Sequence, residues 1–354
     1  MIYFPEPYPD ELLYSVFCRY ADHVWPISYA PSAIDLFGNR YVKPNVDFRN
    51  KLTKEAELCL VRNNSISDIV LYHTMFPYYC RFFPKDLKIS AFNSIIEGSM
   101  SFIPLIPKAL TIPEKERYLC YCPQCAKEDR ERYGETYWHR VHQIPEMTVC
   151  PKHRVRLLPI QAAIKKRTVC RFFSAQSIIS ENARNNDNVT DIELAIAKRL
   201  SDIFLAPYSF HCCFDINEVL HSELIRTGYF SVEECERDLT SLLNDLLLYY
   251  NSIELPFLDY DTLTSILERS SVHPFDIALI SEFLRTSAKE LVFPDYKQLV
   301  TFDETIISMY DRGLSFVEIS QKLDTTYDYV YFTCMCGGGF DDRIRFDKAA
   351  YSKR

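Results

Sequence analysis

Apolar residues recur along most of the chain at three- and four-residue spacing, which is the period of an amphipathic helix. In the N-terminal third this pattern predicts a helix before Pro77 and three others, over residues 10–23, 33–37 and 85–97. Later in the chain the pattern returns in IELAIAKRLSDIF, LTSLLNDLLLYY and FDIALISEFLRTSAKEL. We therefore expect a mainly α protein, in which the segment VCRFF could form a strand.

Residues that favour helix ends agree with these boundaries. Asp10 follows Pro9 and can cap the first helix, while Gly38 and Gly98 can adopt the left-handed conformation that ends a helix. The string HTMFPYYCRFFP, residues 73–84, is rich in aromatic side chains and proline. We expect these aromatic side chains to form core rather than to bind a ligand.

Changes in composition divide the chain into four parts. Prolines at 104, 107 and 113 mark a linker after the first helices, and a group of cysteines and histidines follows it. We expect an N-terminal helical domain, an inserted zinc-finger module with a basic stretch, a second helical domain and a C-terminal region that resembles a helix-turn-helix. These parts cover residues 1–115, 116–172, 173–300 and 301–354.

The C-terminal region has the pattern of two short helices joined by a turn. Gly313 separates two apolar-periodic segments, Ser315 can cap the next helix, and a second turn would start a recognition helix at Tyr327. The expected core positions are Ile319, Leu323 and Val330. A purely structural helical hairpin is the alternative, because residues 301–354 hold seven basic and nine acidic side chains.

Composition and charge narrow the function. A chain of 354 residues that is 47% hydrophobic can bury several cores, and its net charge of −8 argues against coating nucleic acid along its whole surface. The sequence contains no run of eighteen apolar residues and no signal-peptide pattern, so we expect a cytoplasmic protein. Its thirteen cysteines are then expected to be reduced or bound to metal.

Contact with DNA would therefore be local. One stretch has seven basic residues and no acidic one, and it could bind phosphate or could simply be a solvated face: Lys152, Arg154, Arg156, Lys165, Lys166, Arg167 and Arg171. In the C-terminal region Ser315 belongs to the candidate DNA-binding helices, and Arg312 and Lys322 are candidates for phosphate contacts. The candidates for reading bases are Thr325, Thr326, Tyr327 and Tyr329.

Two pairs of residues have the spacing of a zinc site. Cys122 and Cys125 form a CxxC, and Cys150 and His153 repeat the spacing twenty-four residues later with an imidazole as fourth ligand. Four protein ligands close a tetrahedral shell, so we expect one structural zinc ion and no metal-activated water. Nearby residues that could replace a ligand are Cys120, His139 and His142, and a second site could form at Cys334 and Cys336 or at His211, Cys212 and Cys213.

The residues around these pairs resemble a known family. The strings YCPQC at 121–125, YGETYWHRVHQIP at 133–145 and VCPKH at 149–153 are similar to the core of the TniQ/TnsD family of transposon target-selection proteins. The N-terminal FPEPYPDELLYS, the GNR at 38–40 and HTMFPYYCRFFP follow the family in the same order. The resemblance covers residues 1 to about 160 and is only architectural beyond them.

The resemblance implies a non-enzymatic adaptor that marks a target and recruits the AAA+ ATPase TnsC, which brings the transposase subunits. The target would be a DNA site or, alternatively, a CRISPR RNA-guided effector complex; the C-terminal module favours DNA. The resemblance assigns the zinc ligands to Cys122, Cys125, Cys150 and His153. It also implies that Trp138 and Arg140 both pack on the zinc knuckle. A zinc-containing transcription regulator is a rival interpretation, and an enzyme whose site is not visible in the sequence is a weaker one.

Overall fold

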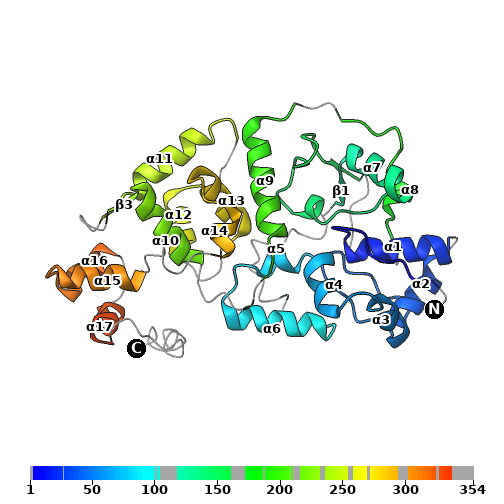
Figure 1. The fold of residues 1–354 in the computed structure, drawn as a ribbon, viewed down its shortest axis with the longest axis horizontal. Coiled ribbons are helices and arrows are strands. Elements are labelled where there is room, and N and C mark those ends of the chain that lie inside the picture. The colour runs from blue at the N-terminus through cyan, green and yellow to red at the C-terminus, as the bar shows by residue number, and fades with distance from the viewer. Residues whose placement is uncertain are drawn as a thin grey trace. The chain divides into compact units, whose positions relative to one another are not determined.

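Figure 1 shows the computed structural model of the chain. Helices dominate its described residues, in which the strands form two short antiparallel pairs, and this confirms the expected mainly α character. None of the helices in the described parts is long and apolar enough to span a membrane. The structure describes residues 3–26, 28–99, 101, 103, 118–160, 172–185, 188–208, 210, 216–231, 236–253, 258–268, 272–293, 302–323 and 327–336.

Contacts divide the chain into two compact units. The first comprises Met1–Cys213 and Ser271–Glu282, and the second comprises Phe214–Ser270 and Phe283–Arg354. The four-part division expected from the sequence is finer than these units and stays a prediction.

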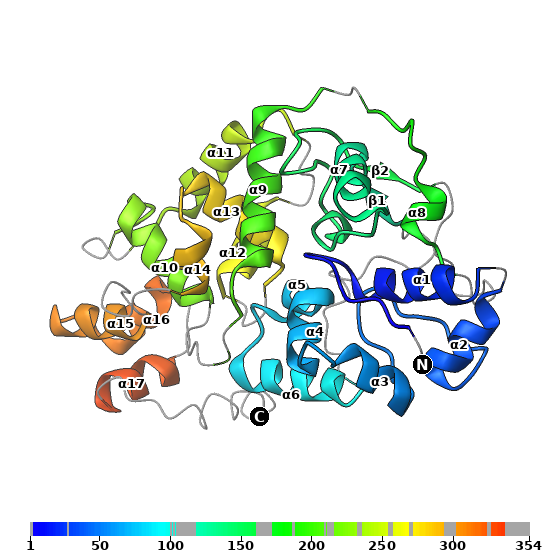
Figure 2. The same ribbon diagram turned by 45° about the vertical axis from the view of Figure 1, so that its right-hand side comes forward.

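The first unit consists of an N-terminal group of helices, a small module around the cysteine pairs, and a long helix that follows both. In Figures 1 and 2, α1 lies between helices α3, α4 and α6 on one side and the module that contains α7 and β1 on the other. Its elements are α1 (Leu13–Val24), α2 (Tyr29–Phe37), α3 (Lys54–Leu60), α4 (Ile66–His73), α5 (Phe76–Cys80), α6 (Lys85–Ile96), β1 (Cys120–Tyr121), α7 (Pro123–Tyr133), the 3-10 helix η4 (Val141–Gln143), β2 (Leu158–Pro159), α8 (Ala175–Ile178), α9 (Asp191–Leu205) and most of α13 (Pro274–Phe283).

The expected helix ends are confirmed at both glycines. Gly38 follows α2 with φ 72°, and Gly98 follows α6 with φ 74°, so both occupy the left-handed region that glycine tolerates best. A Cβ atom on Gly98 would also lie 3.0 Å from the Cα of Lys51. The close approach of the Lys51 backbone is therefore a second reason for glycine at this position.

The expected capping of the first helix by Asp10 is wrong. Helix α1 begins at Leu13 with Leu12 as its N-cap, and Asp10 has φ 56°. The Asp10 side chain instead accepts hydrogen bonds from Arg140 and from the backbone of Val141, far away in the sequence. A tertiary contact has therefore replaced the local one that the sequence suggested.

The aromatic segment of residues 73–84 is core, as expected. Phe76 and Tyr78 are each at most 2% exposed, and the Phe76 ring lies 5.5 Å from that of Phe92 and 5.4 Å from that of Tyr208. The expected strand VCRFF lies mostly outside the described residues. Its last two residues, Phe172 and Phe173, are buried without strand structure.

The second unit is helical, as the returning apolar pattern predicted. A short sheet pairs Phe230 with Arg237 and Ser231 with Glu236 in antiparallel register. Its elements are α10 (Ile216–Thr227), β3 (Phe230–Ser231), β4 (Glu236–Arg237), α11 (Leu239–Tyr249), α12 (Tyr260–Glu268), α14 (Ala288–Val292), α15 (Phe302–Asp311), α16 (Phe316–Lys322) and α17 (Tyr327–Cys336).

The last three helices contact one another, and α17 packs against both α15 and α16. Ser315 caps α16 in a reciprocal capping box with Glu318, which satisfies two backbone donors at the helix start. Ile319, Leu323 and Val330 are buried, and α17 begins at Tyr327. The start of α16 at the Ser315 cap and the three buried core positions agree with the prediction, whereas a helix-turn-helix fold and DNA recognition stay predictions.

Candidate metal centre and its surroundings

The four predicted zinc ligands lie together in the first unit. One ligand atom from each of Cys122, Cys125, Cys150 and His153 falls within 4.8 Å of the other three. The Nδ1 atom of His153 is 3.4, 3.2 and 3.7 Å from the three sulfurs in that order, and the sulfurs of Cys125 and Cys150 are 3.7 Å apart. The three cysteines are at most 6% exposed.

The first pair is held by the start of a helix. Cys122 follows strand β1 and is the N-cap of α7, Pro123 occupies the first turn, and Cys125 follows within that turn. Proline suits this position because its fixed φ is helical and its missing N–H would have no partner there. Strand β1 pairs with β2 in antiparallel register, Cys120 opposite Pro159, so the sheet fixes the chain just before the helix.

The second pair is held by a tight turn. The backbone N–H of Arg154 donates to the carbonyl of Cys150 at 3.0 Å, and the N–H of Cys150 donates to the carbonyl of Val155 at 2.8 Å. Arg154 adopts φ 54° to close this turn. Because the turn brings residues 150 and 153 to the same side, the sulfur and the imidazole can reach one ion.

An exposed carboxylate orients the histidine ligand. Nε2 of His153 lies 2.9 Å from Oε1 of Glu128 on α7, while Nδ1 faces the sulfurs. Nε2 then carries the proton and leaves the Nδ1 lone pair for a metal, the arrangement common around histidine ligands in zinc sites. Glu128 also pairs with Lys152, so the same carboxylate holds two residues of the second pair's turn.

The geometry and chemistry of these donors fit zinc. Metal bonds of about 2.3 Å to sulfur and 2.0 Å to nitrogen give tetrahedral edges of about 3.5–3.8 Å, close to the observed separations. Three buried sulfurs at this spacing cannot all be thiolates without a cation, because like charges disfavour one another. Accordingly, hydrogen bonding with Cys122 raises the pKa of Cys125 and lowers the pKa of Cys150. A divalent ion would stabilise all three thiolates.

The alternative ligands lie around this cluster but outside it. His139 contacts the carboxylate of Asp129 at 3.0 Å, and Cys120 lies on β1. His142 is buried with Nε2 3.8 Å from the Cys125 sulfur, and burial lowers its pKa. Among the described residues, the predicted four form the only group of histidine, cysteine and carboxylate side chains placed to hold a metal ion. Residues 211–213 and the side chain of Cys336, proposed for a second site, lie outside the described part.

Sequence reasoning missed the role of Arg140. Its guanidinium is buried and donates to Asp10 Oδ1 at 3.1 Å and to the carbonyls of Leu71 and Thr74 at 2.9 and 3.1 Å. It also lies 4.9 Å from the ring centre of Phe204 on α9. Arg140 therefore joins the module around the cysteine pairs to the N-terminal segment, to the end of α4 and to α9.

Trp138 makes the same kind of connection. It is fully buried, its backbone N–H donates to the hydroxyl of Ser15 on α1, and its indole N–H donates to the carbonyl of Phe173. Packing on the zinc knuckle was the expected role for Trp138 and Arg140, but their hydrogen bonds lead to other segments. No local pattern could reveal these partners, because they are distant in the sequence.

A buried ion pair reinforces the same junction. Arg19 on α1 donates to Glu11 and to Glu135, each at 2.8 Å, and its guanidinium lies 3.7 Å from the ring centre of Tyr8. The pairs connect the N-terminal segment and α1 with Glu135, two residues after the end of α7. The module around the cysteine pairs and the N-terminal helices are thus held together by charged side chains as well as by apolar packing.

The described part of the basic stretch is already paired. Two of its arginines pair with acidic residues at the start of α9: Arg154 with Asp191 at 2.5 Å, and Arg156 with Glu193 at 2.7 Å. Lys152 pairs with Glu128 on α7. Exposed ion pairs of this kind are worth at most about 1 kcal/mol, so they do not prevent a phosphate from competing. The remaining candidates, Lys165, Lys166, Arg167 and Arg171, lie outside the described residues.

The C-terminal candidates lie on or beside exposed helices. Arg312 and Lys322 are exposed, and Tyr327 is 47% exposed with its ring 6.0 Å from that of Phe316 and 6.3 Å from that of Tyr331. Thr325 and Thr326 lie outside the described residues, and so does the side chain of Tyr329. The sequence of α17, YDYVYFTCMC, contains no lysine or arginine.

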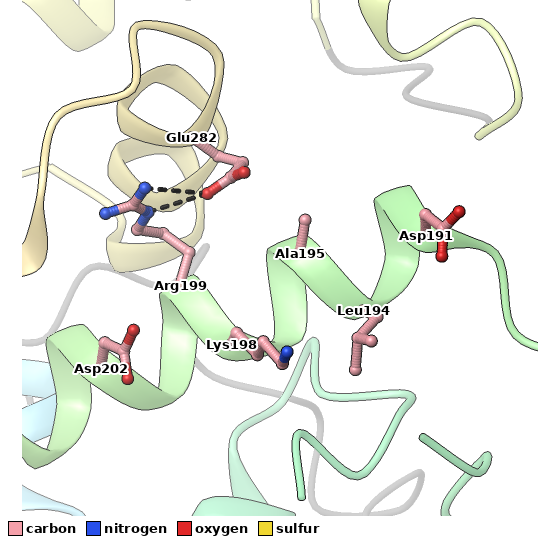
Figure 3. A pocket seen from close by; sticks show the side chains of 7 residues that line it. All are labelled: Asp191, Leu194, Ala195, Lys198, Arg199, Asp202 and Glu282. Atoms are coloured by element: carbon pink, nitrogen blue, oxygen red, sulfur yellow. Dashed lines mark hydrogen bonds and ion pairs between the residues drawn. The ribbon is translucent and has the colours of Figure 1, made fainter. Parts of the chain in front are cut away.

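A hollow of about 270 Å³ lies along α9, and none of the four predicted metal ligands lines it. Figure 3 shows its lining, in which Arg199 pairs with Glu282 at 2.9 Å. Asp191, Lys198 and Asp202 also line it, so it carries charges of both signs. This mixture gives the hollow no preference for a ligand of one charge.

The comparisons with known proteins agree with the residue pattern. Residues 2–157 match the TniQ family model. Over 152 residues the chain is 28% identical to the transposon Tn7 transposition protein TnsD of Escherichia coli, a match that covers 42% of this chain and 30% of that protein. The matched segment contains all four residues of the metal cluster together with Trp138 and Arg140. The N-terminal region of this chain is therefore similar to the TniQ family, and the match to TnsD spans less than a third of that protein's length.

Proposed function

We propose that the chain is a non-enzymatic target-selection adaptor of a TnsABC-type DNA transposition system. It binds a target DNA site, recruits a TnsC-type AAA+ ATPase and, through the ATPase, the transposase subunits. The observation that carries the proposal is the TniQ match over residues 2–157, which includes the assembled ligand cluster. The similarity to TnsD supports the same role, although it covers 30% of that protein.

The zinc ion has a structural role in this proposal. Cys122, Cys125, Cys150 and His153 would hold one Zn²⁺ and complete its shell, which leaves no position for a reactive water. The ion would fix the helix start of α7 against the turn after Cys150. It would thereby position the module whose residues Trp138 and Arg140 reach the N-terminal helices.

The basic residues supply the proposed DNA contact. Lys152, Arg154 and Arg156 surround the zinc turn, and four further basic residues follow up to Arg171. A few well-placed cations suffice despite the net charge of −8, because charges more than about 8 Å away are largely screened at physiological salt. We expect the C-terminal helices to add sequence preference through Thr326 and Tyr327.

A second candidate is docking on a CRISPR RNA-guided effector complex in place of direct DNA recognition. The C-terminal helices favour it, because α17 lacks basic residues and exposes aromatic side chains. Tyr310 and Phe316 stack at 5.0 Å, and Tyr327 and Tyr331 continue the same group of rings. Aromatic clusters of this kind are typical anchors of protein interfaces.

Recruitment of the ATPase is the decisive experiment. The purified chain and the TnsC-type ATPase of the same transposon would be mixed with immobilised target DNA, and ATPase retention would be measured with and without the chain. We expect retention to require the chain. Equal retention without it would refute the adaptor proposal and favour a zinc-containing transcription regulator.

The DNA contacts are tested separately with two sets of substitutions. Replacing Lys165, Lys166 and Arg167 by alanine should weaken binding to all sequences and flatten its salt dependence. Replacing Thr326 and Tyr327 should mainly remove preference for the target. Unchanged preference in the second variant would leave the C-terminal helices as a structural or protein-binding element.

A further inference from the structure

A groove on the first unit has aromatic walls and acidic groups. It lies among the N-terminal segment, α1, α2 and the start of α3, and its volume is about 430 Å³. Tyr3 and Ile34 are 44% and 47% exposed there, so apolar surface faces solvent. Its lining consists of Tyr3, Tyr20, Val24, Ile34, Asp35, Thr53 and Glu55.

The carboxylate of Asp35 is held in place within this groove. Its Oδ2 atom accepts hydrogen bonds from the hydroxyl of Tyr20 and from the indole N–H of Trp25, both at 2.8 Å. The backbone carbonyl of Asp35 accepts from the hydroxyl of Thr53 at 2.7 Å, which ties the end of α2 to the start of α3. Because the surrounding helices fix it, the groove is built before any partner arrives.

Among the described residues, the charged ones that line the groove are all acidic. Its described lining contains two carboxylates, Asp35 and Glu55, and no lysine or arginine. Glu55 is exposed in the first turn of α3, so its carboxylate can reach a cation at the rim. Nucleic acid is disfavoured here because its phosphates would meet like charge.

We propose that this groove binds a protein segment that combines apolar side chains with lysine or arginine. The apolar side chains would cover Tyr3 and Ile34, and the cation would pair with Glu55 and Asp35. An aromatic wall adds to this choice, since arginine and lysine are attracted to the faces of tyrosine and tryptophan. That the natural partner belongs to a transposition system rests on the proposed function, whereas the groove's preference does not.

The chain contains its own reporter for this groove. It has two tryptophans, of which Trp138 is fully buried and Trp25 is 41% exposed and bonded to Asp35. Quenching of tryptophan fluorescence by acrylamide therefore measures access to Trp25. The probes are three short synthetic peptides: one alternates leucine with arginine, one replaces arginine by glutamate, and one replaces leucine by serine.

We expect saturable protection of Trp25 by the leucine–arginine peptide and much weaker protection by the other two. Glu55→Lys should weaken binding about tenfold, because it turns a charge attraction into a repulsion. Ile34→Ser should also weaken binding, because it removes exposed apolar surface and leaves the charge unchanged. Glu131→Lys makes the same charge change as Glu55→Lys but on α7, where the side chain of Glu131 is 65% exposed, and it should leave binding unchanged. Unaltered thermal unfolding of the variants would show that they fold.

Several results would overturn the proposal. Equal protection by the leucine–glutamate peptide or by duplex DNA would refute the charge argument, and full binding by Glu55→Lys would remove the acidic contact. Protection of Trp25 that rises with protein concentration, together with a dimer in sedimentation, would show that a second copy fills the groove. The adaptor role is judged by ATPase retention instead, so its failure would leave the peptide result intact.

Discussion

Replacing Arg140 by methionine should separate the N-terminal helices from the zinc module at a large energetic cost. The buried guanidinium of Arg140 donates to Asp10 and to the carbonyls of Leu71 and Thr74, with donor–acceptor distances of 2.9–3.1 Å. Methionine keeps much of the apolar stem and removes all three donors. The variant therefore tests the hydrogen bonds more than the packing.

The size of the expected stability loss follows from the acceptors that Arg140→Met leaves without a donor. Breaking a buried ion pair by removing one partner costs about 3–5 kcal/mol, and each buried carbonyl without a partner costs about 1–3 kcal/mol. The Asp10 side chain is 21% exposed and can be hydrated in part, which lowers the first cost. The cost of the broken pair already includes groups left without partners, so the two costs are not added. We expect a loss of about 3–5 kcal/mol, a large share of the 5–15 kcal/mol typical of a folded domain.

Urea unfolding followed by tryptophan fluorescence suits this test, because Trp25 and Trp138 both lie in the first unit. Arg132→Met is the matched control, since Arg132 is exposed on α7 and should change stability by less than about 0.5 kcal/mol. Zinc content should stay at one ion per chain in both variants. A similar stability in both would refute the docking role of Arg140, and loss of zinc from Arg140→Met would instead favour packing on the zinc knuckle.

Three further predictions concern the zinc site and the pH dependence. Elemental analysis should find about one zinc per chain, and Cys150→Ser should lose the ion and lower the unfolding temperature; no zinc in fresh wild-type protein would contradict the site. Glu128→Gln should weaken zinc affinity tenfold or more in competition with a chromophoric chelator, and unchanged affinity would exclude an orienting role. Burial lowers the pKa of His73 from 6.5 to about 4 in the folded chain. As the pH falls below 6.5, the unfolded chain therefore takes up a proton on His73 before the folded chain does. The free energy of unfolding should fall by on the order of 3 kcal/mol between pH 6.5 and pH 4. Replacing His73 by Gln should flatten that loss in urea titrations, and an unchanged pH slope would count against it.

The features that could be predicted from the sequence are those whose signal is local. Gly38 and Gly98 end helices because the backbone conformation required there excludes most other residues. Ser315 caps α16 because its partner Glu318 is three positions away. The group of four predicted metal ligands could be foreseen for the same reason. Each ligand pair spans four residues, so one turn of backbone brings its two members together.

The features that the sequence did not reveal depend on partners far along the chain. Asp10 looked like a helix cap, but Arg140 and Val141 hold it in a left-handed conformation outside the helix. The family resemblance suggested that Arg140 packs on the zinc knuckle, yet its acceptors are Asp10 and two carbonyls at the end of α4. A carbonyl acceptor carries no side-chain signature, so no pattern in the sequence could have identified it.

The position of α9 shows that folding requires more than the segment that carries the family resemblance. The match ends at residue 157, but buried Arg81 donates to the carbonyls of Phe204, Ala206 and Pro207 at the end of α9. These carbonyls have no partner within their own helix, and a cation at a helix C-terminus is favoured by the helix dipole. Arg81 could not remain buried without them, because a charge taken from water needs acceptors. The segment that is similar to the TniQ family therefore depends on the later helix for the acceptors of Arg81.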